Sequence, residues 1–295
     1  MPKVNVLLLF GGKSEEHEVS IMSARNVAQA INKDKYNLTL VGIDKVGSWH
    51  ELDEKMLADS KFNLLEIKTG KSNEKGSELA KLKAEKKVDV VFPLLHGPNG
   101  EDGTVQGLLK LMDIPFVGSS VLGSAINMDK DVAKRLLQHA GIPTAMFEVF
   151  RDYEQEKINY ETLKRKLGEV MFVKPANMGS SVGISKVNSN LELEKAVEMP
   201  FKYDHKILVE EAIVGREIEC GVLGNESLTV SLPGEIVPRH DFYDYNAKYI
   251  DENGAKLILP ADLDEEVVKK AQKLASDSYK ILECEGMARV DMFID

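Results

Sequence analysis

The N-terminal segment constrains the fold most, because an apolar run leads through two glycines into an amphipathic helix. Residues 4–10 predict a buried strand, Gly11 and Gly12 a turn, and residues 20–31 a helix with its apolar side chains on one face. Further strands are predicted at 38–43 and 88–95, and a helix at 104–112. Such alternation is typical of a parallel sheet, whose ligands usually bind at the carboxyl ends of the strands.

From Met171 onward the pattern is α+β rather than doubly wound. In one predicted strand, Ile218, Cys220 and Val222 alternate with Glu217 and Glu219, so one face is apolar and the other acidic. The other elements expected in this half are a helix at 129–140, two strands joined by a loop within 171–187, a helix at 191–197, strands at 207–211 and 217–223, a helix at 265–282 and a strand at 288–294.

Composition limits the classes of partner and compartment. The chain has 295 residues, enough for about two domains, and its 38 basic and 48 acidic residues give a net charge of −10. That charge argues against nucleic acid or an anionic membrane as the principal partner. Cys220 and Cys284 are expected to be buried thiols in a reducing compartment, and the N-terminal apolar run is too short for a signal peptide or a membrane span. We therefore expect a cytoplasmic protein.

A loop rich in glycine and serine follows the lysine at position 174. Its residues 179–183 can bring several backbone N–H groups close to phosphate oxygens, while Lys174 adds a compact positive charge. The lysine precedes the glycines, so this is no Walker-type loop. A plain hairpin turn is the alternative interpretation, and this segment alone does not decide between the two.

Six motifs occur in a fixed order along the chain. They are GGKSEEHEVS (11–20), LHGPNGEDG (95–103), MDK (128–130), KPANMGSSVG (174–183), FYDYNAKY (242–249) and ARVD (288–291). Together they closely resemble the D-alanine–D-alanine ligases of the ATP-grasp superfamily. The resemblance implies an N-terminal Rossmann-like parallel-sheet domain (1–125) and a two-lobed ATP-grasp fold, with a central lobe (126–212) and a C-terminal lobe (213–295).

The activity implied by this resemblance is the ATP-dependent joining of two D-alanines for peptidoglycan precursors. The first D-alanine carboxylate attacks the γ-phosphate to give an acyl phosphate, and the amine of the second then displaces phosphate. Both steps develop negative charge, so positive charge, Mg²⁺ (or Mn²⁺) and N–H donors are expected around the transferred group. The implied partners are D-alanine and ATP, with a possible homodimer.

Resemblance also assigns residues to the ATP site. Lysines reach the phosphates, Glu210 and the backbone near residues 212–213 hold the adenine, and Glu217 accepts hydrogen bonds from the ribose. The implied ATP-binding residues are Lys130, Lys174, Glu210, Ala212, Ile213, Glu217 and Lys248. The Lys248–Tyr249 pair favours an amine as the second nucleophile, because relatives that make D-alanyl-D-lactate generally lack it.

Glu16 resembles the carboxylate that receives the ammonium group of the first D-alanine, with Ser180 and Tyr249 as hydroxyl partners that close a lid over it. His96 is implied to border the same substrate. On the predicted last strand, Arg289 would steady the acyl phosphate and Asp291 would bind the metal. Three simpler interpretations stay open: a solvated acid for Glu16, a structural role for His96 and plain packing for the tyrosines of 242–249.

Family members continue past residue 295 into a Glu-x-Asn pair that completes two magnesium sites, followed by a Pro-Gly segment. The expectation is therefore a truncated ligase that keeps the nucleotide and first-substrate sites. Another ATP-grasp ligase, such as a D-alanine–D-lactate ligase, and a non-catalytic nucleotide-binding module are the alternatives. A Rossmann dehydrogenase is a weaker one, because Gly11 and Gly12 lack the full GxGxxG spacing.

Overall fold

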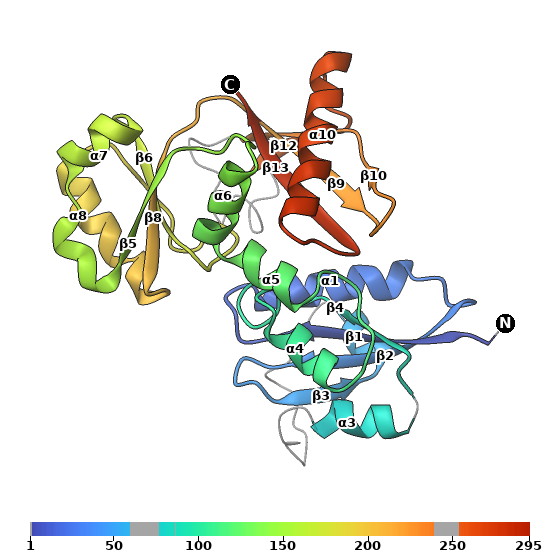
Figure 1. The fold of residues 1–295 in the computed structure, drawn as a ribbon. Helices are drawn as coiled ribbons and strands as arrows, with labels where there is room; N and C mark the ends of the chain where they lie inside the picture. The colour runs from blue at the N-terminus through green and yellow to red at the C-terminus, as the bar shows by residue number, and fades with distance from the viewer. Residues whose placement is uncertain (1, 60–76, 86, 239–253) are drawn as a thin grey trace. The chain divides into compact units, whose positions relative to one another are not determined.

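The structure is a computed structural model that describes residues 2–59, 77–85, 87–238 and 254–295. The chain divides into two compact units, Met1–Ser124 and Ala125–Asp295 (Figure 1). In the described residues, the first unit has one sheet and the second has two, and each unit has its own buried apolar clusters.

The first unit is built on a sheet of strand order β3-β2-β1-β4. Strands β1 (Val4–Gly11), β2 (Tyr36–Ile43) and β4 (Val90–Pro93) run parallel, which confirms the predicted parallel sheet, and β3 (Trp49–Leu52) is antiparallel to β2. The helices are α1 (His17–Ala30), α2 (Glu54–Ala58), α3 (Ser77–Ala84) and α4 (Thr104–Leu111), and α5 (Val121–Met128) includes the last residues of this unit and the first of the next. Helix α1 begins at His17, three residues before the predicted start, so the motif at 11–20 includes its first turn.

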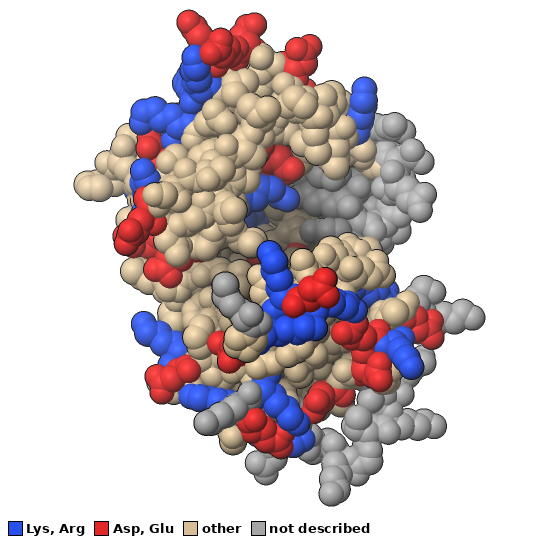
Figure 2. Space-filling view, turned by 90° about the vertical axis from the view of Figure 1, so that its right-hand side faces the viewer, with Lys and Arg blue, Asp and Glu red and all other residues tan. Residues whose placement is uncertain are grey.

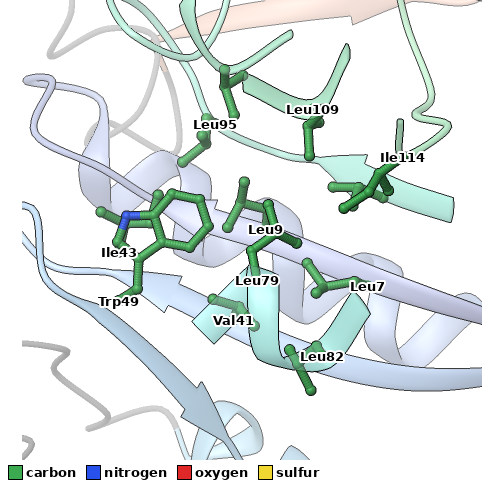
Figure 3. Packing of buried hydrophobic residues seen from close by; sticks show 12 residues of the cluster. Leu7, Leu9, Val41, Ile43, Trp49, Leu79, Leu82, Leu95, Leu109 and Ile114 are labelled. Carbon is green, nitrogen blue, oxygen red and sulfur yellow. The ribbon is translucent and has the colours of Figure 1, made fainter. Parts of the chain in front are cut away.

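Strand β1 is apolar on both faces because both faces of this sheet are covered. Leu7 and Leu9 pack with side chains of β2, β3 and α3 (Figure 3), whereas Val6, Leu8 and Phe10 pack with α1 on the opposite face. All five are buried. This burial explains why the run at 4–10 could be recognised as a strand.

The second unit contains a four-stranded antiparallel sheet of order β5-β8-β6-β7. Its strands are β5 (Phe147–Arg151), β8 (Lys206–Glu211), β6 (Met171–Pro175) and β7 (Ser185–Val187). Helices α7 (Tyr160–Leu167) and α8 (Asn190–Glu198) share a buried core with these strands (Figure 1). Helix α6 (Lys130–His139) and the 3-10 helices η2 (Asp152–Lys157) and η3 (Pro200–Lys202) complete this part.

A second sheet in this unit has the order β10-β9-β11-β12, and β13 pairs with β9. The strands are β9 (Arg216–Leu223), β10 (Thr229–Val230), β11 (Gly234–Pro238), β12 (Ala255–Ile258) and β13 (Met287–Ile294). Ile218, Cys220 and Val222 are buried against α10 (Glu265–Ile281), whereas Glu217 and Glu219 are only half-buried. The predicted apolar and acidic faces of this strand are therefore confirmed.

Charges of both signs are interspersed on the face shown in Figure 2, and neither sign dominates it.

None of the helices in the described ranges is both long enough and apolar enough to cross a membrane.

Candidate functional site

The N-terminus of α6 places Lys130 against the glycine-rich loop. Asp129 caps the helix by accepting hydrogen bonds from the backbone N–H groups of Asp131 and Val132, at 3.1 and 3.2 Å. The Lys130 N–H donates to the carbonyl of Ala176 at 3.0 Å, and its Nζ donates to the carbonyl of Met178. Main chain and side chain of one residue thus join α6 to the loop that follows β6.

Two further lysines meet on the carboxylate of Glu210. Its Oε1 accepts from Lys134 Nζ at 2.6 Å, and its Oε2 pairs with Lys174 Nζ. Glu210 is buried on β8, Lys174 lies on β6 and Lys134 on α6. Lys130, Lys134, Lys174 and Glu210, hereafter the lysine cluster, hold three ammonium groups and one carboxylate, an excess of positive charge suited to a phosphate chain.

The pKa values in the lysine cluster follow from burial and mutual charge. Burial, followed by the charge of Lys174, lowers the pKa of Lys130 to about 8, and burial also lowers the pKa of Lys134. Burial alone would raise the pKa of Glu210, but Lys174 and Lys134 outweigh it and the net direction is downward. Glu210 therefore stays ionised at neutral pH.

Lys134 was not among the residues expected from the sequence. It also lies with its Nζ 5.0 Å from the centre of the Phe147 ring, a cation–π contact. Its spacing from Lys130 could have indicated it, because residues four apart, such as Lys130 and Lys134, lie on the same face of a helix.

The loop between β6 and β7 has the geometry of a hairpin, and its role in phosphate binding stays a prediction. The two strands pair directly, with Met171 opposite Val187, so the segment is a hairpin. Within it, Ser180 and Ser181 have positive φ angles of 49° and 62°, an uncommon conformation for residues with a side chain. Local backbone strain of this kind is concentrated at ligand sites, which favours the phosphate interpretation.

The other residues expected at the nucleotide lie at the end of β8 and on the second sheet. The N–H of Ala212 donates to the carbonyl of Val170 at 3.2 Å, so an adenine contact from Ala212 would use its carbonyl oxygen. Ile213 follows directly in the chain. Glu217 lies on β9, opposite Ile236 of β11 and Phe293 of β13. Its place beside the ribose stays a prediction.

Arg289 and Asp291 contact each other on β13, as expected for residues two apart on a strand. The Nε and Nη2 groups of Arg289 donate to the two Asp291 carboxylate oxygens at 2.7 and 2.9 Å. Glu219, opposite Asp291 on β9, also pairs with Arg289 at 3.1 Å. These two carboxylates are oxygen ligands of the kind that Mg²⁺ prefers, but the described residues hold no group of three His, Cys, Asp or Glu side chains placed for a metal.

In the first unit, Ser14 links Glu16 to His96, because its Oγ also accepts a hydrogen bond from the backbone N–H of Glu16 at 3.3 Å. The Ser14 hydroxyl donates to the carbonyl of His96 at 2.6 Å, and Ser23 Oγ lies 3.0 Å from His96 Nε2. A Cβ atom built on Gly97 would lie 2.7 Å from Glu16 Oε2, so the carboxylate lies against that glycine. Glu16 is only 6% exposed, which rules out a solvated loop acid.

Lys248 and Tyr249 lie outside the described residues. Ser180 belongs to the second unit and Glu16 to the first, so the bridge between Glu16, Ser180 and Tyr249 also stays a prediction.

Comparison with known proteins identifies the family. The family model described as "D-ala D-ala ligase N-terminus" matches residues 5–119, and "D-ala D-ala ligase C-terminus" matches residues 136–295. The chain belongs to the D-alanine–D-alanine ligase family. It is 51% identical to the D-alanine–D-alanine ligase of Oceanobacillus iheyensis, over 99% of this chain and 83% of that protein. It is also 45% identical to D-alanine–D-alanine ligase A of Escherichia coli K12, over 100% of this chain and 84% of that protein.

Solved structures of the ligase family support the same conclusion. The VanG D-Ala:D-Ser ligase from Enterococcus faecalis aligns with a TM-score of 0.83 and 36% identity, covering 99% of this chain and 86% of that one. The ligase from Coxiella burnetii aligns with a TM-score of 0.78 and 34% identity, covering 99% and 82%. The predicted fold class, an α/β part followed by an ATP-grasp fold, is confirmed. The boundaries at 125 and 212 stay predictions.

Proposed function

We propose that this ligase joins two D-alanines through a D-alanyl phosphate intermediate, with ATP as co-substrate, for peptidoglycan precursors. The observation that carries the proposal is the lysine cluster at the glycine-rich hairpin of a chain that belongs to this family. In the cluster, Lys130 and Lys174 hold phosphate oxygens. Glu210, kept ionised by its lysine partners, accepts from the adenine amino group, and Glu217 accepts from the ribose hydroxyls.

In the first step, the carboxylate of one D-alanine attacks the γ-phosphorus of ATP and ADP leaves. Lys130 and Lys174 stabilise the charge that develops on the phosphoryl oxygens, because a fixed ammonium group in a site with little water interacts strongly with an anion. Glu16 receives the ammonium group of that D-alanine, and His96 borders it. Ser180, Tyr249 and Lys248 close over the reacting groups and exclude water.

In the second step, the amine of the other D-alanine attacks the acyl carbon and phosphate leaves. Arg289 stabilises the tetrahedral intermediate. To do so, the Arg289 guanidinium must first leave its contact with the Asp291 carboxylate. Asp291, with Glu219 beside it, would hold Mg²⁺ (or Mn²⁺), which neutralises phosphate charge when bound. We also propose that the protein is cytoplasmic and forms a homodimer, and that it has no nucleic acid or membrane partner.

A coupled assay for ADP, with and without D-alanine, tests this function. We expect ADP formation that depends on D-alanine and a dipeptide product. Lys174→Met should abolish it, whereas Lys186→Met, an exposed lysine of β7 on the same hairpin, should leave it unchanged.

The same assay separates the alternatives. Incubation with D-alanine plus D-lactate or D-serine, followed by product analysis, identifies the second substrate; a depsipeptide or a D-alanyl-D-serine product would replace the D-alanine proposal. Binding of ATP with no ADP formed under any of these conditions would instead favour a nucleotide-binding module.

A further inference from the structure

Lys206 is a buried lysine outside the lysine cluster. It is 6% exposed, at the start of β8. Its Nζ lies 2.8 and 2.6 Å from the two carboxylate oxygens of Asp129 and 2.9 Å from Oδ2 of Asp131. A buried ammonium group is costly unless it is paired and hydrogen-bonded, and here two carboxylates pair with it. These carboxylates flank Lys130 in the chain.

The backbone around Lys206 binds the start of the loop that Lys130 contacts, which begins at Ala176. The carbonyl of Lys206 accepts from the N–H of Ala176 at 2.9 Å. The backbone N–H of Lys206 donates to Asp204 Oδ1 at 3.1 Å. The other oxygen of this carboxylate, Asp204 Oδ2, accepts from the backbone and side-chain nitrogens of Asn177 at 2.7 and 2.9 Å. The segment 204–206 therefore fixes the first residues of the glycine-rich hairpin loop.

We propose that Lys206 is a positioning residue for ATP: it ties the N-terminus of α6 to the strand that anchors the hairpin loop, and so sets where the Lys130 ammonium group lies. This role rests on the proposed function, in which Lys130 holds phosphate oxygens. The geometry supports it because the Lys206 side chain binds both neighbours of Lys130, while its backbone binds Ala176, the residue whose carbonyl accepts from the Lys130 N–H.

Replacement of Lys206 should therefore weaken ATP binding more than D-alanine binding. Lys206→Met removes the cation that holds Asp129 and Asp131, so Lys130 loses its fixed place at the loop. We expect the Kd for ATP to rise about tenfold or more, which corresponds to the loss of about 1.4 kcal/mol of binding free energy. The KM for D-alanine should change less than the Kd for ATP, because the residues proposed to hold its ammonium group, Glu16 and His96, belong to the first unit and have no bond to Lys206 or its carboxylate partners among the described contacts.

Two variants serve as controls. Lys206→Arg keeps a cation that can bind Asp129 with two N–H groups, so ATP affinity should return to within about threefold of the parent protein. Arg135→Gln removes the exposed guanidinium that also pairs with Asp131, at 2.8 Å, but leaves α6 tied to β8. Its ATP affinity should be unchanged.

The Lys206→Met variant leaves two carboxylates without their shared cation and is at risk of misfolding. If the single variant does not fold, the double variant Asp129→Asn with Lys206→Met replaces it in the test of ATP binding. Asparagine caps helices as well as aspartate does and carries no charge. Calorimetry of ATP binding and steady-state kinetics are the measurements.

Unchanged ATP affinity in the folded single or double variant would overturn the proposal. So would an equal loss of ATP and D-alanine binding, which would mean a general structural role. A failure of the proposed function can be distinguished from a failure of this inference. ATP binding by the parent protein without D-alanine-dependent ADP formation would contradict the ligase activity. The comparison of the Kd values for ATP would still test the role of Lys206.

Discussion

The ammonium group of Lys130 lies among groups that change its pKa in opposite directions. Burial and Lys174 on β6 lower the pKa, whereas Glu210 on β8, Asp204 before β8 and Asp129 at the N-cap of α6 raise it, and the result is about 8. The group is thus mostly protonated at neutral pH and mostly neutral above pH 9. Only the protonated form attracts phosphate.

We predict that ATP binding weakens as pH rises through about 8. Bound phosphates favour the charged lysine and raise its pKa, so affinity falls by up to about tenfold per pH unit between the free and bound pKa values. Calorimetry between about pH 7 and 9.5 measures this fall. In Lys130→Arg the fall should be much smaller, because arginine stays protonated throughout; an equally steep fall in that variant would assign the titration to another group.

Gly97 gives a second prediction at this scale. In Gly97→Ala the new methyl group would meet Glu16 Oε2 at 2.7 Å, in a backbone with φ of 74°. The carboxylate must move, so the KM for D-alanine should rise by about tenfold or more. Gly118→Ala is the matched control: it has a φ of 108° but nothing within 4 Å of its new methyl group. A D-alanine KM raised equally in both variants would show that backbone strain, and not Glu16, is responsible.

At the scale of elements, α6 carries two separate functions on its first turns. Lys130 and Lys134 join the lysine cluster, whereas Asp131 and Arg135 form an i,i+4 ion pair at 2.8 Å beside Lys206. Asp131 keeps a lowered pKa because its bonds to Lys206 and Arg135 outweigh the opposing effect of burial. Helix spacing therefore separates the lysines proposed to contact the nucleotide from Asp131, which ties the helix to Lys206.

Helix α7 is held to its sheet by a buried tyrosine. The Tyr160 hydroxyl lies 2.5 Å from the carbonyl of Asn188 and 3.1 Å from that of Glu169, and the residue is 4% exposed. Tyr160→Phe removes the donor and leaves carbonyl oxygens short of a partner, so it should lower the free energy of unfolding by about 1–2 kcal/mol. Tyr153→Phe, at a residue that is 78% exposed, should change it by less than about 0.5 kcal/mol.

Urea denaturation of both variants measures these changes. A loss below about 0.5 kcal/mol in Tyr160→Phe would mean that the hydroxyl does not contribute to the stability of this lobe.

At the scale of the whole molecule, the residues proposed for the two ligands come from different units. Glu16 and His96 lie in Met1–Ser124, whereas the lysine cluster lies in Ala125–Asp295. A ligand that binds only the native state stabilises the segments that contact it, which amide hydrogen exchange detects.

We predict distinct protection patterns for the two ligands. ATP alone should slow exchange at residues 130–134 and 174–183, and D-alanine alone at residues 12–16 and 96–97. Exchange measured by mass spectrometry at saturating ligand tests both. Protection of 12–16 and 96–97 by ATP alone, with none at the hairpin, would contradict the assignment of the two sites.

Secondary structure was predictable for several segments that carried a full pattern of their own. Strand β1, buried on both faces, and α10, with a long apolar stripe, were both expected close to their observed bounds. Strand β5 was missed, because its residues are half-buried or exposed and its order comes from pairing with β8. The short strands β3, β10 and β12 were missed for the same reason: two to four residues carry no period, and only their partners make them strands.

The sequence by itself determined the order of motifs, the alternation that produces each sheet and the residue types needed for phosphate and carboxylate binding. Only the tertiary structure decided which charges meet. Lys134 and Glu210 are 76 residues apart, and Lys206 and Asp131 are 75 apart, yet each pair is in contact. The physical reason is that periodicity and turn chemistry act over a few residues, whereas the pairing of buried charges depends on which elements pack together.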